Sequence, residues 1–179
     1  TMALAGFAQN DAKTLFESGK AKMSKFDSEQ VKLQMRQPFD STLMCESLMG
    51  GYADFMKALP MDTIFETEKD GTPKIDKKTG KQKYKTKFSK EIVGLISGHH
   101  NDFALIGQFY NEKKDYLNAA KAWELYASLP NAEFLGSSKP ALADSTAGQF
   151  YYYVGVMYYQ VKDNKKALDA FKNAVKKGY

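Results

Sequence analysis

The chain is poor in the residues that build covalently linked or metal-held scaffolds. Its 179 residues include one cysteine, Cys45, and two adjacent histidines, His99 and His100. A single cysteine excludes an intramolecular disulfide framework and any zinc site built on several thiolates. We therefore expect Cys45 to be a small buried apolar side chain on a helix. The alternative, a catalytic thiol, needs a histidine nearby in space, and nothing in the sequence brings one to Cys45.

Long apolar runs and arginine are also scarce. No stretch approaches the ~18 consecutive apolar residues that a transmembrane helix needs, so no membrane span is predicted. Arg36 is the single arginine, whereas the segment from Lys69 to Lys90 holds nine lysines and only two acidic residues. The rest of the chain carries 17 basic and 19 acidic groups, so the net charge of +5 belongs to this one segment.

Apolar and aromatic residues are plentiful, at 43% and 13% of the chain, which favours a packed fold over disorder. The first residues, Thr1 to Ala8, are apolar and end in a small-x-Ala pattern of the kind that signal peptidase cleaves. We expect residues 1-8 to be a signal-peptide remnant, and the protein to be exported to the periplasm or the extracellular space. The alternative is an ordinary apolar segment at the start of a helix.

Residues 9-60 have the apolar spacing of helices. A first helix is predicted over 11–37, with Gly19 or the stretch 26–28 as candidate interruptions and Pro38 as its end. Asp40 or Ser41 is expected to cap a second helix, which runs to about residue 59 and stops at Pro60.

Between residues 61 and 88 the helical period gives way to alternating residues, with turn signals at Asp70-Gly71 and Thr79-Gly80. This pattern predicts one or two β-hairpins projecting from a helical body. Ser89 is expected to cap a short helix that completes a Lys-rich insertion over 61-97. Since this insertion has few aromatic residues and no arginine, we expect it to be solvated and to bind no nucleic acid. Docking of an acidic partner is the alternative.

The last 80 residues contain an internal repeat. Helices are predicted at 101–113, 116–129, 146–162 and 164–177, with Asp115 and Asp163 in the short connections. Counted from Gly107 or from Gly155, residues of similar character recur at offsets −4, −1, +3, +12 and +16. Two antiparallel helices need a small residue where their backbones cross, and aromatic side chains fill the grooves on either side. The two sets are Phe103, Ile106, Gly107, Tyr110, Ala119, Trp123 and Tyr151, Val154, Gly155, Tyr158, Ala167, Phe171. At offset +19 the two copies differ, with Tyr126 in the first and the small residue Ala174 in the second.

This pattern resembles the tetratricopeptide-repeat (TPR) motif, a helix–turn–helix of 34 residues, over about 100-133 and 148-179. The two glycines lie 48 positions apart, which implies an insertion around 130–145. Gly51, Phe55 and Ala58 have the spacing of a TPR second helix, but the matching first helix would contain Pro38, so 9-60 is expected to hold a degenerate repeat. The whole chain resembles exported TPR proteins of Bacteroides-type bacteria. The resemblance implies an all-α fold, an antiparallel helix-pair superhelix with a small β-hairpin insertion.

In TPR proteins one face of each first helix lines a concave groove that binds peptides or partner segments. The matching positions, carried over residue by residue, are expected to bind a protein or peptide partner. They lack the lysines and arginines with which some TPR proteins hold a free carboxylate. The alternative is that they face solvent or another helix of the chain. These positions are Asn101, Gln108, Asn111, Glu112, Gln149, Tyr152 and Tyr159, with Ala104, Val156 and Gln160 beside them.

The resemblance implies a protein-binding module. No Gly-rich phosphate loop, Ser/His/Asp order or nucleophile-elbow pattern appears in the sequence, so we expect no catalysis, metal or cofactor. Two rival functions stay open. The first rival function is a metal-dependent hydrolase with His99 and His100 at its centre. Adjacent helical residues point ~100° apart, so these two rarely share one metal, and Asn101 or Asp102 is rather expected to cap the helix that follows. In the second rival the chain is a structural subunit of an envelope assembly, which oligomerises through an uncapped last repeat.

Overall fold

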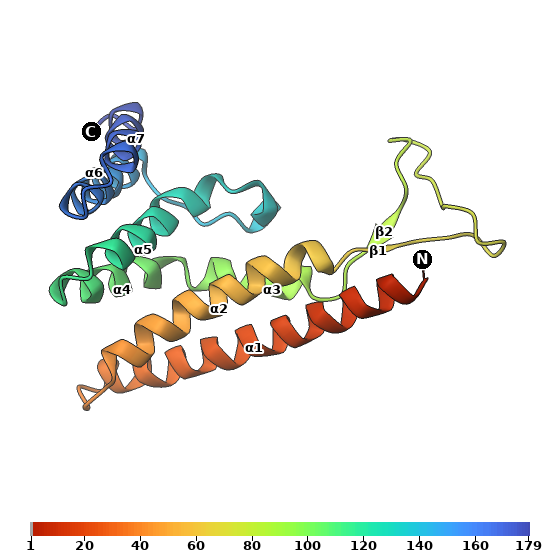
Figure 1. The fold of residues 1–179 in the computed structure, drawn as a ribbon, viewed down its shortest axis with the longest axis horizontal. Coiled ribbons are helices and arrows are strands. Elements are labelled where there is room, and N and C mark those ends of the chain that lie inside the picture. The colour runs from red at the N-terminus through yellow and green to blue at the C-terminus, as the bar shows by residue number, and fades with distance from the viewer. Residues whose placement is uncertain (1) are drawn as a thin grey trace.

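The computed structural model describes the backbone of residues 2–179 and the side chains of residues 10–179. The chain is all-α with a small β insertion, as the sequence predicts (Figure 1). Short 3₁₀ turns at Leu129–Asn131 and Glu133–Ser138 lie in the link between the last two helix pairs. The elements are α1 (Met2–Gln34), α2 (Ser41–Met61), β1 (Ile64–Phe65), β2 (Tyr84–Lys85), α3 (Ser89–Gly98), α4 (His100–Glu112), α5 (Tyr116–Ser128), α6 (Asp144–Gln160) and α7 (Asn164–Lys176).

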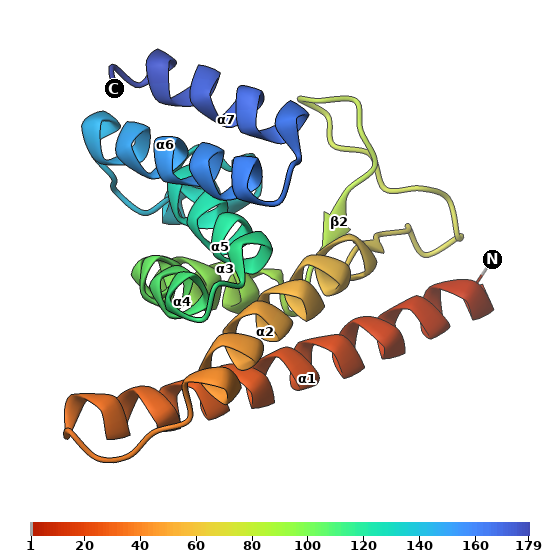
Figure 2. The ribbon, with the colours of Figure 1, turned by 60° about the vertical axis from the view of Figure 1, so that its left-hand side comes forward.

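Three antiparallel helix pairs make up the body, α1 with α2, α4 with α5, and α6 with α7 (Figures 1 and 2). The pairs are stacked in chain order, because α2 packs on α4 and α5 packs on α6. Helix α3 contacts α2 and the link after α5. The last four predicted helices begin and end within two residues of the observed bounds, and Asp115 and Asp163 cap α5 and α7 through their side chains.

Helix α1 is continuous, so the predicted interruptions at Gly19 and at residues 26–28 are wrong. Both places keep the helical period, with Gly19 and Phe26 buried and Asp27 facing outward. The helix ends at Gln34, before Pro38, and Arg36 takes a left-handed conformation in the connection (φ 57°). The expected signal-peptide remnant falls on residues 1-8, whose side chains lie outside the described residues.

Asp40 caps α2 as expected, since its carboxylate accepts hydrogen bonds from the backbone of Thr42 and Leu43, each at 2.9 Å. The end of α2 differs slightly from the prediction, because Pro60 lies within the last turn and the helix continues to Met61.

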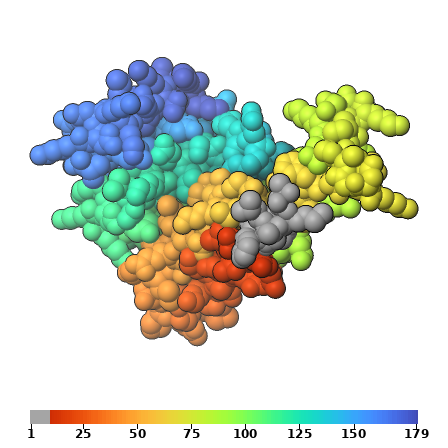
Figure 3. Space-filling model, turned by 45° about the vertical axis from the view of Figure 1, so that its right-hand side comes forward, coloured from red at the N-terminus to blue at the C-terminus, as the bar shows by residue number. Residues whose placement is uncertain are grey.

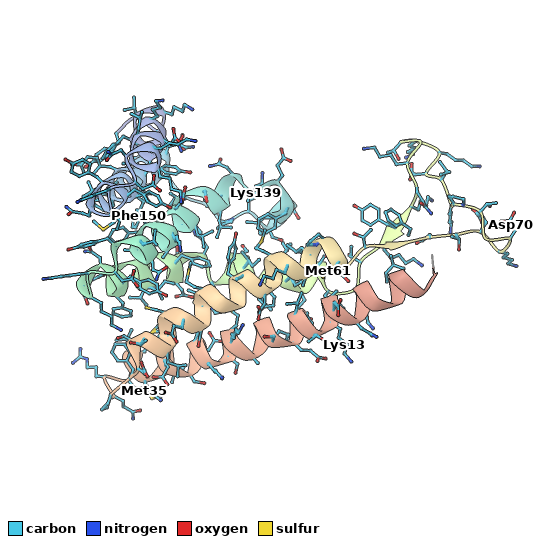
Figure 4. The ribbon with its side chains drawn as sticks, viewed as in Figure 1. Lys13, Met35, Met61, Asp70, Lys139 and Phe150 are labelled. Carbon is cyan, nitrogen blue, oxygen red and sulfur yellow. The ribbon has the colours of Figure 1, made fainter. Side chains whose placement is uncertain are left out.

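The expected β insertion is present and stands away from the helical body (Figure 3). Strands β1 and β2 pair antiparallel, and two isolated bridges extend the excursion between them. Asp70 lies at its tip and Met61 at its root (Figure 4). Gly71 and Gly80 have positive φ values of 85° and 68°, which L-residues with a side chain rarely adopt. These two glycines therefore make the two predicted turns.

Helix α3 is capped from outside, so the prediction that Ser89 caps it is wrong. The carboxylate of Asp62, just after α2, accepts hydrogen bonds from the backbone N–H groups of Phe88 and Ser89, each at 2.7 Å. It also accepts the Ser89 hydroxyl. Asp62 is fully buried, and one carboxylate thus satisfies several of the backbone donors that a helix start leaves unpaired. The same residue ties the end of α2 to the start of α3.

The first helix pair also has a glycine at the point where its two helices cross and an aromatic ring against that glycine. The sequence predicted only a degenerate repeat there. A Cβ on Gly19 would collide with the ring of Phe55, just as one on Gly107 would collide with Trp123 and one on Gly155 with Phe171. Gly19 and Phe55 are 36 positions apart, whereas the other two glycines lie 16 positions before their rings. The matching first helix is therefore α1, and Pro38 lies in a longer connection rather than inside a helix.

Candidate binding hollow between helices α2, α5 and α7

The predicted contact residues of α4 lie on its surface. Asn101, Gln108 and Glu112 are exposed and Asn111 is half-buried. Gln108 Nε2 donates to Glu112 Oε1 at 2.9 Å, a bond within one helix face. Most of these side chains are accessible to solvent, and Asn101 also contacts the side chain of His100.

The predicted contact residues of α6 form a second, separate patch. Gln149 Nε2 donates to the Tyr153 hydroxyl at 2.7 Å. Tyr152 packs its ring against Tyr153, and Tyr159 is 65% exposed. Because α6 packs on α5 and has little contact with α4, the structure does not bring this patch to the α4 residues.

The first histidine ties α4 to α1. Asp102 does not cap α4, contrary to the prediction, because its carboxylate accepts from His99 Nδ1 at 2.9 Å and from Gln30 Nε2 at 2.6 Å. The other ring nitrogen, His99 Nε2, lies 3.7 Å from Asp27 Oδ1. The hydrogen bond to Asp102 and the charges of both acids raise the pKa of His99.

The second histidine serves packing. His100 is 2% exposed, its Nε2 lies 2.7 Å from the Tyr126 carbonyl oxygen, and its ring stacks on Tyr126. Burial lowers its pKa. The two rings thus point to different partners, and among the side chains of residues 10–179 no three His, Cys, Asp or Glu are grouped to hold a metal. Cys45 is buried as expected, its thiol faces the Ile106 carbonyl at 3.8 Å, and burial raises its pKa to about 11.

A hollow of about 550 Å³ opens where the three helix pairs meet. Four lining residues belong to α5 and three to α2, and within each helix they are spaced so that they lie on one face. Helices α6 and α7 close the end with one residue each. We call it the central hollow; its lining is Met49, Tyr52, Ala53, Lys121, Glu124, Leu125, Ser128, Tyr151 and Asn173.

The lining of the central hollow is mainly apolar, and most of its polar side chains form no hydrogen bond within the described part of the chain. The hydroxyls of Tyr52, Tyr151 and Ser128 and the amide of Asn173 form no hydrogen bond within the described part of the chain. Burial raises the pKa of both tyrosines, with the charge of Glu124 adding to the effect at Tyr151. Both phenols therefore stay protonated at neutral pH and can donate hydrogen bonds.

Glu124 is the anchored acid of the central hollow. Its Oε2 accepts the Tyr158 hydroxyl at 2.9 Å, which leaves its second oxygen open to a ligand. Among the described residues, Lys121 on the same face has one hydrogen-bond contact, a long one of 3.5 Å from its Nζ to Asn118 Oδ1. The hollow thus offers one acid, one ammonium and four neutral polar groups in a mainly apolar lining.

Tyr151 and Tyr158 belong to the same repeat set, whose aromatic members are predicted to pack between the helices, but the structure buries only Tyr158. Tyr158 is 2% exposed, whereas Tyr151 is half-buried and lines the central hollow.

No protein-family model, curated protein or solved structure matches this chain. The comparisons therefore show no family. None of the helices in the described part of the chain is both long and apolar enough to span a membrane.

Proposed function

We propose that the chain is a protein-interaction module that binds a segment of a partner protein in the central hollow. The observation that carries the proposal is the combination of a mainly apolar lining with hydroxyl and amide groups that form no hydrogen bond within the described part of the chain. An extended peptide presents apolar side chains together with backbone groups that need hydrogen bonds, so it matches both features. The volume lies within the ~300–1,000 Å³ range that is usual for binding pockets.

The proposed module is of the TPR type. Support comes from the sequence pattern and from the three crossings in which a glycine faces an aromatic ring. The predicted contact residues of α4 and α6 are proposed as further contact surfaces, supported by the exposure of Gln108 and Tyr159. We also propose action outside the cytoplasm, for which the support is the residue pattern of 1-8 alone.

Selection of random 12-residue peptides on the immobilised protein tests the proposal, followed by affinity measurement with labelled peptides. Ala53→Arg places a long cationic side chain at an exposed wall position of the central hollow. Ala21→Arg is the matched control, since it makes the same change on the exposed surface of α1. We expect selected peptides to bind the Ala53→Arg variant at least tenfold more weakly and the Ala21→Arg variant unchanged.

Tyr151→Phe keeps the ring and removes the free hydroxyl. Loss of one hydrogen bond is worth ~0.5–1.5 kcal/mol, so we expect affinity to fall about 2- to 10-fold. The proposal fails if no peptide family is enriched, or if the selected peptides bind all of these variants equally.

Self-assembly through the last helix pair is the second hypothesis. It is favoured by the exposed apolar side chains Leu168 and Val175 of α7. Light scattering over a hundredfold range of protein concentration tests it, and a constant monomer mass rules it out. For the hydrolase hypothesis, replacement of His99 and His100 by alanine should leave the zinc content unchanged if both rings serve packing.

A further inference from the structure

The outer face of α7 carries an apolar stripe. Leu168 is 54% exposed and Val175 is 70% exposed, with Phe171 half-buried between them. We call these three residues the α7 stripe. They line a shallow hollow of about 380 Å³ that Lys172 and Lys176 border. An apolar stripe with this 3–4 spacing is the usual seat of another helix.

The matching residues of α5 pack against another helix of the fold. The residues 48 positions before the α7 stripe are Ala120, Trp123 and Ala127, and all three are buried. Ala120 and Trp123 belong to the buried cluster that α5 shares with α6, and α6 presents Phe150 and Tyr153 to the Trp123 ring at centroid distances of 6.1 Å and 5.6 Å. The two aromatic residues lie three positions apart on one face of α6.

The α7 stripe has the same position in its helix pair as Ala120, Trp123 and Ala127 of α5 have in the preceding pair. Trp123 crosses Gly107 and Phe171 crosses Gly155, so both second helices are fixed against their first helices by the same contact. The face that α5 turns to α6 therefore corresponds to the face of α7 that no element in the described part of the chain covers. The expected occupant is a helix of α6 chemistry, with two aromatic side chains three positions apart.

Helix α1 of a second copy of this chain does not have the two aromatic residues that such a helix needs. Aligning Gly19 with Gly155 puts Thr14 and Glu17 at the positions of Phe150 and Tyr153. Both residues are exposed, and Glu17 forms an ion pair with Lys13. This face of α1 is polar, so stacking of copies head to tail would bury charges against the α7 stripe.

Charge also opposes pairing of two α7 stripes and points to an acidic partner. Lys165, Lys172 and Lys176 form no ion pair with any residue in the described part of the chain. A twofold arrangement would bring Lys172 and Lys176 of both copies together around the contact, because such interfaces are self-complementary. Acidic residues on the partner helix would instead complement them.

We propose that the α7 stripe is a docking surface for an amphipathic helix of a partner protein. That helix carries two aromatic residues three positions apart and acidic residues along its edges. It continues the contact that α5 makes with α6, and recognition follows the helix-in-groove mode. The site is separate from the central hollow, to which α7 contributes only Asn173.

The test uses a fluorescent peptide with the sequence of α6, residues 144–160, in which Gln149, Tyr159 and Gln160 are replaced by Glu. A second peptide also has Ser at Phe150 and Tyr153, and a third has Lys in place of the three Glu residues. Anisotropy titrations are expected to show binding of the first peptide and at least tenfold weaker binding of the other two.

Variants of the protein locate the site. The double variant Leu168→Asn/Val175→Asn is expected to bind the first peptide at least tenfold more weakly. Val31→Asn is the matched control, because Val31 is an exposed valine on α1. Ala53→Arg should also leave binding unchanged, which separates this site from the central hollow. Because the substituted side chains are exposed, circular dichroism should show the fold of the wild type.

Three results overturn the proposal. The first is absence of binding, or equal binding to the stripe variant and the wild type. The second is a change in Trp123 emission on peptide addition, which shows that the peptide displaces α6 from α5. The third is a concentration-dependent dimer that the stripe variant abolishes, which makes a second copy the occupant.

Discussion

The contact between Gly107 and Trp123 gives the sharpest test of the fold. A Cβ at position 107 would overlap the indole ring of Trp123, well inside van der Waals distance. The ring cannot move aside easily, since Trp123 is 8% exposed, donates from Nε1 to the Ala104 carbonyl at 3.1 Å and packs against Phe150 and Tyr153. Gly107→Ala therefore forces two helices apart or breaks the indole hydrogen bond.

The magnitude follows from three contributions. Alanine stabilises a helix interior by ~1 kcal/mol relative to glycine. Overpacking of a core contact costs ~1–3 kcal/mol, and weakening of the indole hydrogen bond costs ~1 kcal/mol more. We expect Gly107→Ala to lower the free energy of unfolding by about 1–3 kcal/mol.

Two matched substitutions calibrate this value. A Cβ at Gly155 would lie 2.5 Å from Phe171 Cε1, but Phe171 is half-buried and its ring can shift toward solvent. Gly155→Ala should thus stay within ~1 kcal/mol of the wild type. Gly94 has no atom within 4 Å of its added Cβ and lies within α3, so Gly94→Ala should raise stability by up to ~1 kcal/mol.

Urea unfolding followed by circular dichroism measures all three variants, and the fluorescence of the single tryptophan reports directly on the Gly107 site. A Gly107→Ala variant as stable as Gly94→Ala would contradict the predicted clash with Trp123, because the two helices would then have room for a methyl group where they cross.

Asp62→Ala should lower the free energy of unfolding by about 2–4 kcal/mol in urea titrations, since it leaves several backbone donors at the start of α3 unpaired; a loss below ~0.5 kcal/mol contradicts the capping role. His99→Gln should destabilise the protein more at about pH 5.5 than at about pH 9. The raised pKa of His99 means that its pairs with Asp102 and Asp27 stabilise the fold below the unfolded-state pKa of ~6.5, and that this contribution is lost as pH rises through the folded-state pKa. Equal losses at both pH values would contradict it. The Cys45 thiol should react with a disulfide reagent at about pH 8 at least a hundredfold more slowly in the native protein than in urea, because it is buried with a pKa of about 11.

Local signals explain what the sequence could predict. The helices after residue 100 follow the 3.6-residue period, and Asp115 and Asp163 cap α5 and α7 from adjacent positions. The crossings at Gly107 and Gly155 were predictable because each glycine and its aromatic partner lie 16 positions apart in both pairs.

Non-local contacts explain what the sequence could not predict. The contact between Gly19 and Phe55 could not be predicted, because these two residues are 20 positions farther apart than the glycine and the aromatic residue of the other two pairs. A repeat with a fixed spacing therefore does not include it. The carboxylate of Asp62 caps a helix start that lies 26 positions later, at Phe88. Asp102 does not cap α4, because its carboxylate accepts hydrogen bonds from His99 and Gln30 instead. The central hollow needs the relative placement of α2 and α5, so no single segment of the chain encodes it.

The cap at Asp62 has a consequence for how this chain can change in evolution. The carboxylate fixes the residue that leaves α2 next to the residues that enter α3, so the excursion between them starts and ends at one point. Closing a loop between fixed ends costs only ~0.6 kcal/mol more for each doubling of its length. We expect related chains to gain and lose residues around Gly71 and Gly80 freely, while an acid persists at the position of Asp62.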